Sequence, residues 1–237
     1  MNAADSQLTL PTGQPAMLQA TGVRRCDGER VLLDDVSVSI QGGDRIAVVG
    51  PTGSGKTLLL RSLAKLDRLD AGDVLWHGTP VRGHDVPRFR SQVIYLHQRP
   101  TLIEGTVEDN LRHPFSLRVH QDKPFHRERV VDLLLSLGRD DSFLLKQQRD
   151  LSGGESQLTS LLRAIQLNPS ILLLDESTAA LDPTAASIVE TLVTNWLNKM
   201  PAGRATVWVT HDQQQAERIA DRILELDVGC LRPRSPT

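Results

Sequence analysis

The first third of the chain alternates short apolar runs with turns. The runs at 36–40, 45–49 and 93–96 are rich in Val and Ile, and glycine or proline residues separate them. This pattern predicts strands throughout the region. The exception is the segment 55–66, where leucine and alanine recur without interior proline or glycine. We therefore expect a helix directly after the strand that ends at Val49.

The pattern changes to helical spacing between about residues 101 and 146. Apolar residues recur at helical intervals through 130–137, and a polar, proline-containing segment at 113–124 interrupts the pattern. A region of this kind between two groups of strands predicts an inserted helical subdomain. We place that subdomain at about residues 101–168.

Helices and strands alternate from residue 154 onward. The apolar strands at 171–174 and 205–209 each precede a helical segment, at 183–199 and 213–220. Such alternation predicts an α/β fold in which helices cover parallel strands. In the first of these helices, apolar residues at spacings of four predict a buried stripe. The stripe consists of Ile188, Leu192 and Trp196.

Composition indicates an ordinary globular chain, whose length allows one large domain or two small ones, and its apolar pattern favours one. The 237 residues are 39% hydrophobic and 24% charged, which argues against a disordered, collagen-like or coiled-coil protein. We expect the domain to span residues 16–230, with a polar, flexible leader at 1–15 and a tail at 231–237. The apolar runs are far shorter than the roughly 20 residues of a membrane-spanning helix, and the first 23 residues contain no Lys or Arg. We therefore expect no secretory signal, no direct membrane insertion and a cytoplasmic location.

Charge, cysteine and histidine residues argue against further classes of binding. Lys and Arg total 27 against 29 Asp and Glu, a formal charge of -2, so we expect no nucleic acid partner. Cys26 and Cys230 are too few for a disulfide framework or a thiolate metal site. The spacing of His113, His120 and His126 matches no metal-ligand pattern, and we expect all three to be solvated.

One segment matches the phosphate-binding pattern GxxxxGK[ST] between a predicted strand and a predicted helix. It consists of Gly50, Pro51, Thr52, Gly53, Ser54, Gly55, Lys56 and Thr57. A triphosphate needs inward-facing backbone amides, glycines where a side chain would block it, and the positive end of a helix. Gly53 and Gly55 meet the steric demand. Lys56 can reach the β- and γ-phosphates, and the Thr57 hydroxyl can bind Mg2+.

Two adjacent carboxylates follow the apolar run at 171–174. Asp175 and Glu176 should therefore lie at the end of the sheet where ligands bind in α/β proteins. We expect Asp175 to hold Mg2+, directly or through water, and Glu176 to accept a proton from, or orient, the water that attacks the γ-phosphate. A solvated strand end is the alternative, and the phosphate loop earlier in the chain favours the catalytic interpretation.

A serine and two glycines precede another predicted helix and again offer backbone amides to an anion. The segment is Leu151-Ser152-Gly153-Gly154-Glu155. It resembles the LSGGQ motif of the ATP-binding cassette (ABC) family, and the resemblance covers about residues 18–227. In that family the motif binds the γ-phosphate held by the phosphate loop of a second subunit. The resemblance implies ATP and Mg2+ as cofactors, and a homodimer that encloses two nucleotides with contacts from Ser152, Gly153, Gly154 and Glu155.

Other positions match further motifs of the family. Gln98 resembles the glutamine that senses magnesium and the partner protein, and His211 resembles the switch histidine that contacts the γ-phosphate. Residues 180–182 resemble the loop that crosses between subunits, although Ala179 replaces its usual serine. The resemblance implies catalytic roles for Glu176, His211, Gln98 and Lys56, and magnesium ligands in Thr57, Gln98 and Asp175. It also implies a P-loop NTPase fold of the ABC ATPase type, with a mixed-sheet core, an antiparallel β subdomain and an inserted helical subdomain.

Two further positions depart from the family pattern. Where relatives place an aromatic residue against adenine, residues 24–27 contain no ring. Arg25 is a candidate to stack on the base, and a solvated loop arginine is the alternative. Leu158 stands where many relatives have an arginine. Neither change touches the residues predicted to bind phosphate.

The resemblance implies an ATP hydrolase subunit that dimerises around two Mg-ATP molecules and drives a separate integral-membrane permease. Within the family, LLLDESTAALD and VWVTHD are most similar to the YbbL-like (Fet-type) iron exporter ATPases. That similarity implies a peripheral homodimer at the cytoplasmic face of the bacterial inner membrane, paired with the permease of an iron exporter.

Three alternatives stay open. Lipoprotein-release and amino-acid import ATPases share the same motifs. A soluble ABC ATPase that drives assembly of a cellular complex, of the iron-sulfur cluster or cell division type, belongs to a different class. A nucleotide-binding regulator without turnover is disfavoured, because Glu176 and His211 are both present.

Overall fold

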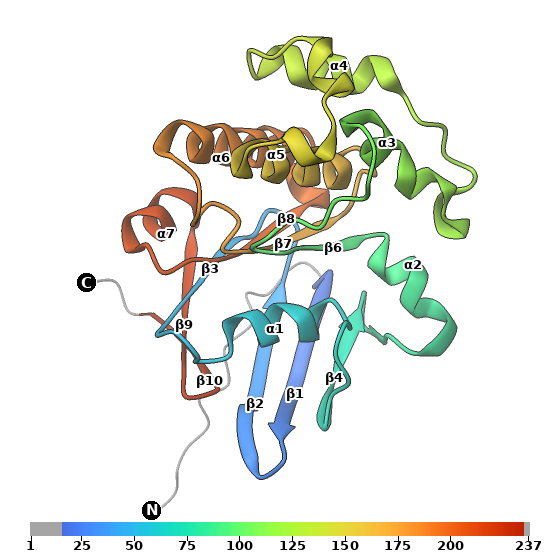
Figure 1. Cartoon of the computed structure of the whole chain (residues 1–237). Coiled ribbons are helices and arrows are strands. Elements are labelled where there is room, and N and C mark those ends of the chain that lie inside the picture. The colour runs from blue at the N-terminus through green and yellow to red at the C-terminus, as the bar shows by residue number, and fades with distance from the viewer. Residues whose placement is uncertain (1–15, 235–237) are drawn as a thin grey trace, which may run out of the picture.

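The computed structural model describes residues 16–234, which form two sheets and their covering helices (Figure 1). The leader predicted at 1–15 and the last three residues of the predicted tail lie outside the described residues.

The central sheet has six strands in the order β10-β9-β3-β8-β7-β6. These are β3 (Arg45–Val49), β6 (Val93–Leu96), β7 (Ile171–Asp175), β8 (Ala205–Val209), β9 (Arg222–Asp227) and β10 (Cys230–Pro233). Neighbouring strands are parallel, except that β10 is antiparallel to β9. The predicted mixed-sheet core is therefore confirmed, and the carboxyl ends of its parallel strands share one edge.

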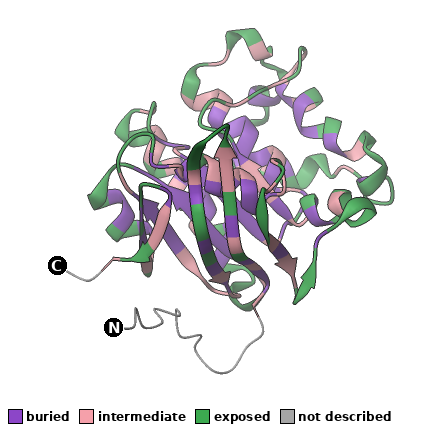
Figure 2. Ribbon diagram, turned by 90° about the horizontal axis from the view of Figure 1, so that it is seen from below, coloured by how far each residue is buried: buried purple, intermediate pink, exposed green. Residues whose placement is uncertain are grey.

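The second sheet has four strands in the order β2-β1-β4-β5. These are β1 (Leu18–Asp27), β2 (Arg30–Ile40), β4 (Ala71–Trp76) and β5 (Thr79–Pro80). Every neighbouring pair is antiparallel, as the resemblance implies. Buried positions alternate with more exposed ones along β1 and β2 (Figure 2), so one face of this sheet packs on the core while the other meets water.

Helices connect the parallel strands. Helix α1 (Lys56–Leu63) follows β3 and confirms the helix predicted after that strand, and α2 (Val86–Arg90) precedes β6. Between β6 and β7 the chain forms α3 (Val107–Arg112), α4 (Arg127–Ser136) and α5 (Gly153–Ile165) (Figure 1). Helices α6 (Pro183–Asn198) and α7 (Gln213–Ile219) then connect β7 to β8 and β8 to β9. Crossovers of this length are what parallel pairing requires.

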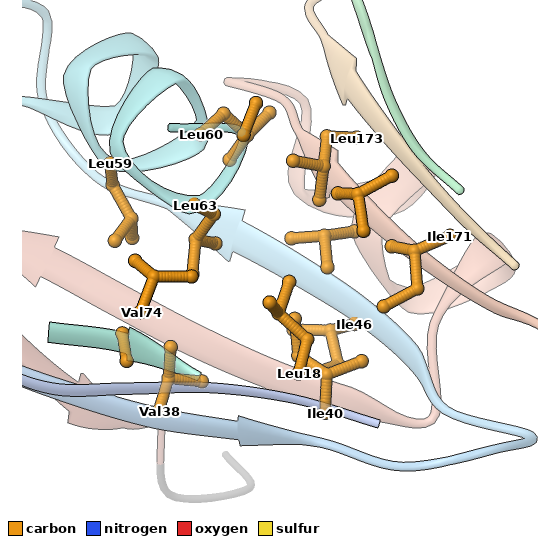
Figure 3. Close-up of a cluster of buried hydrophobic side chains, with 14 of the residues drawn as sticks. Leu18, Val38, Ile40, Ile46, Leu59, Leu60, Leu63, Val74, Ile171 and Leu173 are labelled. Atoms are coloured by element: carbon orange, nitrogen blue, oxygen red, sulfur yellow. The ribbon is translucent and has the colours of Figure 1, made fainter. Parts of the chain in front are cut away.

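Strand β7 contributes to two separate parts of the core. Ile171 and Leu173 pack with α1 and the antiparallel sheet (Figure 3). Leu172 and Leu174 pack with residues of α5 and α6. Because successive side chains of a strand point to opposite faces, a strand covered on both faces needs a continuous apolar run. The run at 171–174 supplies it.

Two predictions about burial have opposite outcomes. The stripe on α6 is confirmed, since Leu192 and Trp196 are buried and Ile188 packs against the same cluster. The expectation that His120 is solvated is wrong, because this residue is only 4% exposed. A 3-10 turn at Arg118–His120 places it in a groove beside α5, where burial and the nearby Lys123 lower its pKa. The other two histidines of the insertion are exposed.

Candidate active site

The phosphate loop lies between β3 and α1. Gly50 has a φ of +144°, and a Cβ built there would lie 2.1 Å from the carbonyl oxygen of Leu226. Gly55 has a φ of +104°, and its Cβ would lie 2.9 Å from the carbonyl oxygen of Leu32. A side chain at either position would have to displace backbone. The loop thus keeps the glycine-dependent shape that brings backbone amides close to an anion at a helix N-terminus.

Lys56 folds back over this loop. The residue is 6% exposed, and its Nζ donates to the carbonyl oxygens of Gly50 and Pro51, each at 2.9 Å. These bonds offset the cost of burying an ammonium group. They hold the positive charge inside the loop, where it was predicted to serve the β- and γ-phosphates.

Three oxygen-bearing side chains meet where α1 approaches the end of β7. The Thr57 hydroxyl donates to Asp175 Oδ1 at 3.1 Å, and the Tyr95 hydroxyl donates to Asp175 Oδ2 at 2.7 Å. Burial and the hydrogen bond to Asp175 raise the pKa of Tyr95, so the phenol stays protonated and keeps donating. Sequence reasoning missed Tyr95. The contact follows from the register between β6 and β7, which pairs Tyr95 with Leu173, two residues before Asp175.

Glu176 is the centre of a second group. Gln98 Nε2 donates to Glu176 Oε2 at 2.8 Å, and His211 Nδ1 lies 3.8 Å from the same oxygen. Glu176 has a φ of 44°, a conformation that costs a non-glycine residue roughly 1–3 kcal/mol. Its N–H donates to the carbonyl oxygen of Val209 at 3.0 Å, which helps to hold it there.

The structure thus brings the predicted catalytic residues Gln98, Glu176 and His211 together. They follow β6, β7 and β8, so they meet at the carboxyl edge of the central sheet. Among the described residues, no hydrogen bond joins Gln98 to Thr57 or Asp175, the other two predicted magnesium ligands. The amide of Gln98 is engaged by Glu176 instead.

A buried glutamine links the segments that follow β7 and β8. Gln215 Nε2 donates to Thr178 Oγ1 at 2.6 Å, and the Thr210 hydroxyl donates to Gln215 Oε1 at 2.7 Å. The same Nε2 donates to Glu190 Oε1 at 2.8 Å, and Arg218 binds both oxygens of that carboxylate. Sequence reasoning missed Gln215, because nothing in the local pattern of α7 distinguishes it from its polar neighbours.

The segment at 151–155 begins helix α5. Ser152 is the N-cap: its Oγ accepts from the N–H of Glu155 at 3.2 Å, and Glu155 Oε2 accepts from the N–H of Ser152 at 3.1 Å. Two helix-terminal donors are therefore satisfied reciprocally. Ser152 and Gly153 are exposed, and a Cβ built at Gly153 would meet no atom within 4 Å. This predicted phosphate-contacting segment lies open at the surface.

The carboxylate of Glu155 is bound by its own chain. Lys146 Nζ lies 2.7 Å and Arg139 Nη1 lies 3.1 Å from Glu155 Oε1. Burial alone would raise the pKa of Glu155, but hydrogen bonds from Lys146, the Ser152 backbone and Arg139 lower it to about 2. Glu155 therefore ties the helical insertion to the start of α5, and its contact with a nucleotide stays a prediction.

The two departures from the family pattern have different settings. Arg25 Nη1 donates to Asp70 Oδ2 at 2.8 Å, and the same oxygen accepts from the N–H of Cys26 at 2.7 Å. A carboxylate thus holds this guanidinium, and its stacking on adenine stays a prediction. Leu158 is 2% exposed within the core that α5 covers. An arginine buried in its place would need a partner for its charge.

Two features are absent from residues 16–234. No group of three or more His, Cys, Asp or Glu residues there could hold a metal ion. None of the helices there combines the length with the apolar character that a membrane-spanning segment requires. The predicted magnesium pair of Thr57 and Asp175 is of a different kind, because one of its two oxygens belongs to a hydroxyl.

Comparison with known sequences matches a family model described as ABC transporter over residues 33–179. The "Probable iron export ATP-binding protein FetA" of Escherichia coli is 35% identical over 210 residues, which cover 89% of this chain and 91% of that protein. A "Sulfate/thiosulfate import ATP-binding protein CysA" of Nocardia farcinica is 36% identical over 219 residues, which cover 90% of this chain and 63% of that protein.

Among solved structures, the chain is similar to an ATP-binding cassette described as a dimer in a post-hydrolysis state bound to ADP and Pi. The TM-score is 0.79 at 27% sequence identity, and the alignment covers 92% of this chain and 98% of that one. The predicted fold, a P-loop NTPase of the ABC ATPase type, is confirmed.

Proposed function

Because this chain belongs to the ABC transporter family as an ATP-hydrolysing, nucleotide-binding subunit, we propose that two copies close around two Mg-ATP molecules to drive a separate membrane permease. The observation that carries this proposal is the meeting of Gln98, Glu176 and His211 around one carboxylate oxygen. That oxygen belongs to Glu176, which directly follows Asp175. Asp175 accepts a hydrogen bond from Thr57, the last residue of the phosphate loop. The groups that hold phosphates and the groups that act on water are therefore adjacent.

Thr57 and Asp175 are the residues that would hold Mg2+. Their hydroxyl and carboxylate oxygens lie 3.1 Å apart and are the hard donors that this cation prefers. When bound, Mg2+ neutralises charge on the β- and γ-phosphates. The Tyr95 hydroxyl holds the other oxygen of Asp175 and so fixes the carboxylate in this orientation. Lys56 adds a positive charge from within the loop.

Glu176 is the proposed general base. It accepts a proton from water while the water oxygen bonds to the γ-phosphorus, the bond to the bridging oxygen breaks, and ADP and phosphate are released. Gln98 holds Glu176 Oε2 at 2.8 Å and so orients the carboxylate. His211, near the same oxygen, is proposed to contact the γ-phosphate.

The exposed start of α5 is proposed to complete the site of a second copy. Ser152 and Gly153 lie open at the surface, where backbone amides at a helix N-terminus favour an anion. The dimeric state of the similar ADP- and Pi-bound cassette supports this arrangement. Contacts from both chains to the γ-phosphate would favour the closed dimer, and their loss on hydrolysis would favour reopening.

A groove beside Gln98 is the proposed docking site for the permease, at the cytoplasmic face of the membrane. It has a volume of about 410 Å³ and lies between α2, β6 and α5. The exposed apolar residues Leu117 and Val119 line it, and so does His97, the neighbour of Gln98. A helix of the permease seated there would contact the segment that orients Glu176, which would couple transport to hydrolysis.

We propose iron as the exported species. Similarity to a protein named for iron export supports this choice, and the similarity to sulfate/thiosulfate import proteins makes import of an anion the competing function. The chain spans 91% of the first protein but 63% of the second, which favours the export subunit as the closer match in overall length.

Steady-state ATPase rates measured against chain concentration test the dimeric mechanism. The rate per chain should rise with concentration, and it should fall by at least about 100-fold in Glu176→Gln. If the rate is independent of concentration, sizing the ATP-bound Glu176→Gln variant separates the remaining cases. A preformed dimer is consistent with the mechanism, and a monomer contradicts it.

A strain that lacks this chain tests the transported species. Under iron load the strain should accumulate more iron than its parent, and the wild-type chain should correct this while Glu176→Gln should not. Unchanged iron content with reduced sulfate uptake would contradict iron export.

Tagged chain recovered from solubilised membranes should bring an integral-membrane protein with it, and its purification without one would favour the assembly ATPases instead.

A further inference from the structure

A second large cavity lies between the helical insertion and α6. It has a volume of about 790 Å³ and is lined by residues of α4, the end of α5, and the last turns of α6. None of the residues assigned above to nucleotide, magnesium or catalysis lines it. Its size is that of a pocket for a small organic molecule. Its apolar wall consists of Phe115, Val130, Leu133, Ile165, Leu192 and Trp196.

A buried guanidinium forms part of this wall. Arg204 is 6% exposed, and its side chain stacks over the Trp196 ring with 4.9 Å between the guanidinium carbon and the ring centroid. Its Nη1 donates to the carbonyl oxygen of Trp196, and its Nη2 donates to Asn168 Oδ1. Within residues 16–234 it forms no ion pair with a carboxylate, and burial lowers its pKa. A buried charge without a counter-charge is unfavourable.

The remaining charges around the cavity do not supply that counter-charge. Arg129 and Lys199 line it as well, and Asp132 is the single carboxylate among its lining residues. Three cations therefore face one anion. An excess of positive charge and an apolar wall therefore occur together in this cavity.

A purely structural role explains only part of this arrangement. Arg204 joins the ends of α5 and α6, where helix carbonyls favour a cation. That role accounts for its two hydrogen bonds. It does not account for a cavity of this size beside them, or for Arg129 and Lys199 on the walls.

We propose that this cavity is a binding site for an amphipathic organic anion, separate from the nucleotide site. The ligand carries a carboxylate, sulfonate or phosphate group that pairs with Arg204, Arg129 and Lys199. Its aromatic or aliphatic body lies along the apolar wall beside Trp196.

Fluorescence titration of the full chain with anilinonaphthalene sulfonate tests the site. We expect saturable binding that weakens about tenfold in Arg129→Glu/Lys199→Glu, because like charges would then face the sulfonate. The uncharged analogue phenylnaphthylamine should bind the wild-type chain about tenfold more weakly than the sulfonate. Both substituted residues are exposed, so the variant should retain the cooperative melting of the wild type.

Two control variants locate the probe. Arg30→Glu/Arg232→Glu makes the same charge change at exposed residues that do not line the cavity, and it should bind the sulfonate as the wild type does. Arg90→Glu changes the groove proposed for the permease and should likewise leave the affinity unchanged. The proposal is overturned by absent saturable binding, by equal losses in the two double variants, by a larger loss in Arg90→Glu, or by equal affinity for the uncharged analogue.

Discussion

The phosphate-loop edge of the central sheet and the surface segment at 151–155 differ in how their side chains are held. At the sheet edge, Thr57, Asp175 and Tyr95 are bonded across three elements, and Gln98 and Glu176 join two more segments. At the surface segment, the cap bonds stay within the first turn of α5, and the ion pairs of Glu155 reach only Arg139 and Lys146.

In the proposed dimer, this difference separates what one chain does alone from what requires a second chain. The sheet edge is assembled by the fold itself, so its geometry exists before any partner arrives. The segment at 151–155 is ordered by its own capping box but leaves Gly153 open to whatever approaches. Substitutions at the sheet edge should therefore affect ATP hydrolysis within each chain, and substitutions at 151–155 should affect dimerisation around the nucleotide.

The largest effect should come from the sheet edge, in Glu176→Gln. Loss of the proposed general base should lower kcat by about 100- to 10,000-fold and leave ATP binding intact, since the amide replaces the carboxylate at nearly the same volume. Sizing with ATP should show a trapped dimer. Turnover at the wild-type rate would remove the catalytic role of Glu176 and with it the distinction between the two regions.

Gly153→Asp tests the surface segment with little disturbance of the folded chain. The new side chain has open space and begins a helix, where a carboxylate is tolerated. Its charge would face the γ-phosphate of a second copy, so the ATPase rate should fall roughly 100-fold, a loss in the range of a removed transition-state contact. Single-site binding of ATP to the monomer should be unchanged. Gly153→Ala is the matched control, and equal losses in both variants would contradict the charge argument.

Acid titration sharpens the comparison at Glu155. Because its folded-state pKa is depressed to about 2, its stabilisation is present above the unfolded value near 4.5 and is lost as the pH falls toward 2. Linkage predicts a loss on the order of 2 kcal/mol in unfolding free energy by pH 3. Denaturant unfolding from pH 7 to pH 3 should show this slope in the wild type and a weaker one in Glu155→Gln. Identical slopes would mean that the ion pairs of Glu155 add no stability.

Gln215→Leu should have the smallest of these effects. It removes the bonds to Thr178 and Thr210, and these hydroxyls lie in the segments that carry Glu176 and His211. We expect kcat to fall by about tenfold, near the net worth of a buried hydrogen bond, while KM for ATP stays unchanged. Gln215→Met, which keeps the length of the side chain but none of its hydrogen bonds, including the bond to Glu190, should lower kcat as far as Gln215→Leu does. A rise in KM without a fall in kcat would show that Gln215 acts on nucleotide binding instead.

The sequence predicts those parts of the site that consist of consecutive residues. The phosphate loop, the Asp175-Glu176 pair and the cap at Ser152 are each local, because one strand end or helix start determines what they can bind. The central sheet was also predictable, since β7 is apolar at every position that both faces cover.

Other parts depend on which segments the fold brings together. Tyr95 reaches Asp175 because of the register between β6 and β7. Gln215 binds Thr210, five residues before it, and Thr178, 37 residues before it. His120 becomes buried because a short turn packs beside α5. Hydrophobic periodicity carries no information on any of these three contacts, so local reasoning gave each residue no role or the wrong environment.

The order of strands in the central sheet has a consequence for how the protein is made. Strand β3, which ends at the phosphate loop, is flanked by β8 and β9, and Ile46 pairs with Val207 and Arg222. The ribosome synthesises β3 early and its two neighbours late, with only β10 following them among the strands of residues 16–234. At about 5–20 residues per second, the strand waits on the order of ten seconds for either neighbour. During that interval a nascent chain exposes an unpaired apolar strand, so protection from aggregation is needed well before nucleotide can bind.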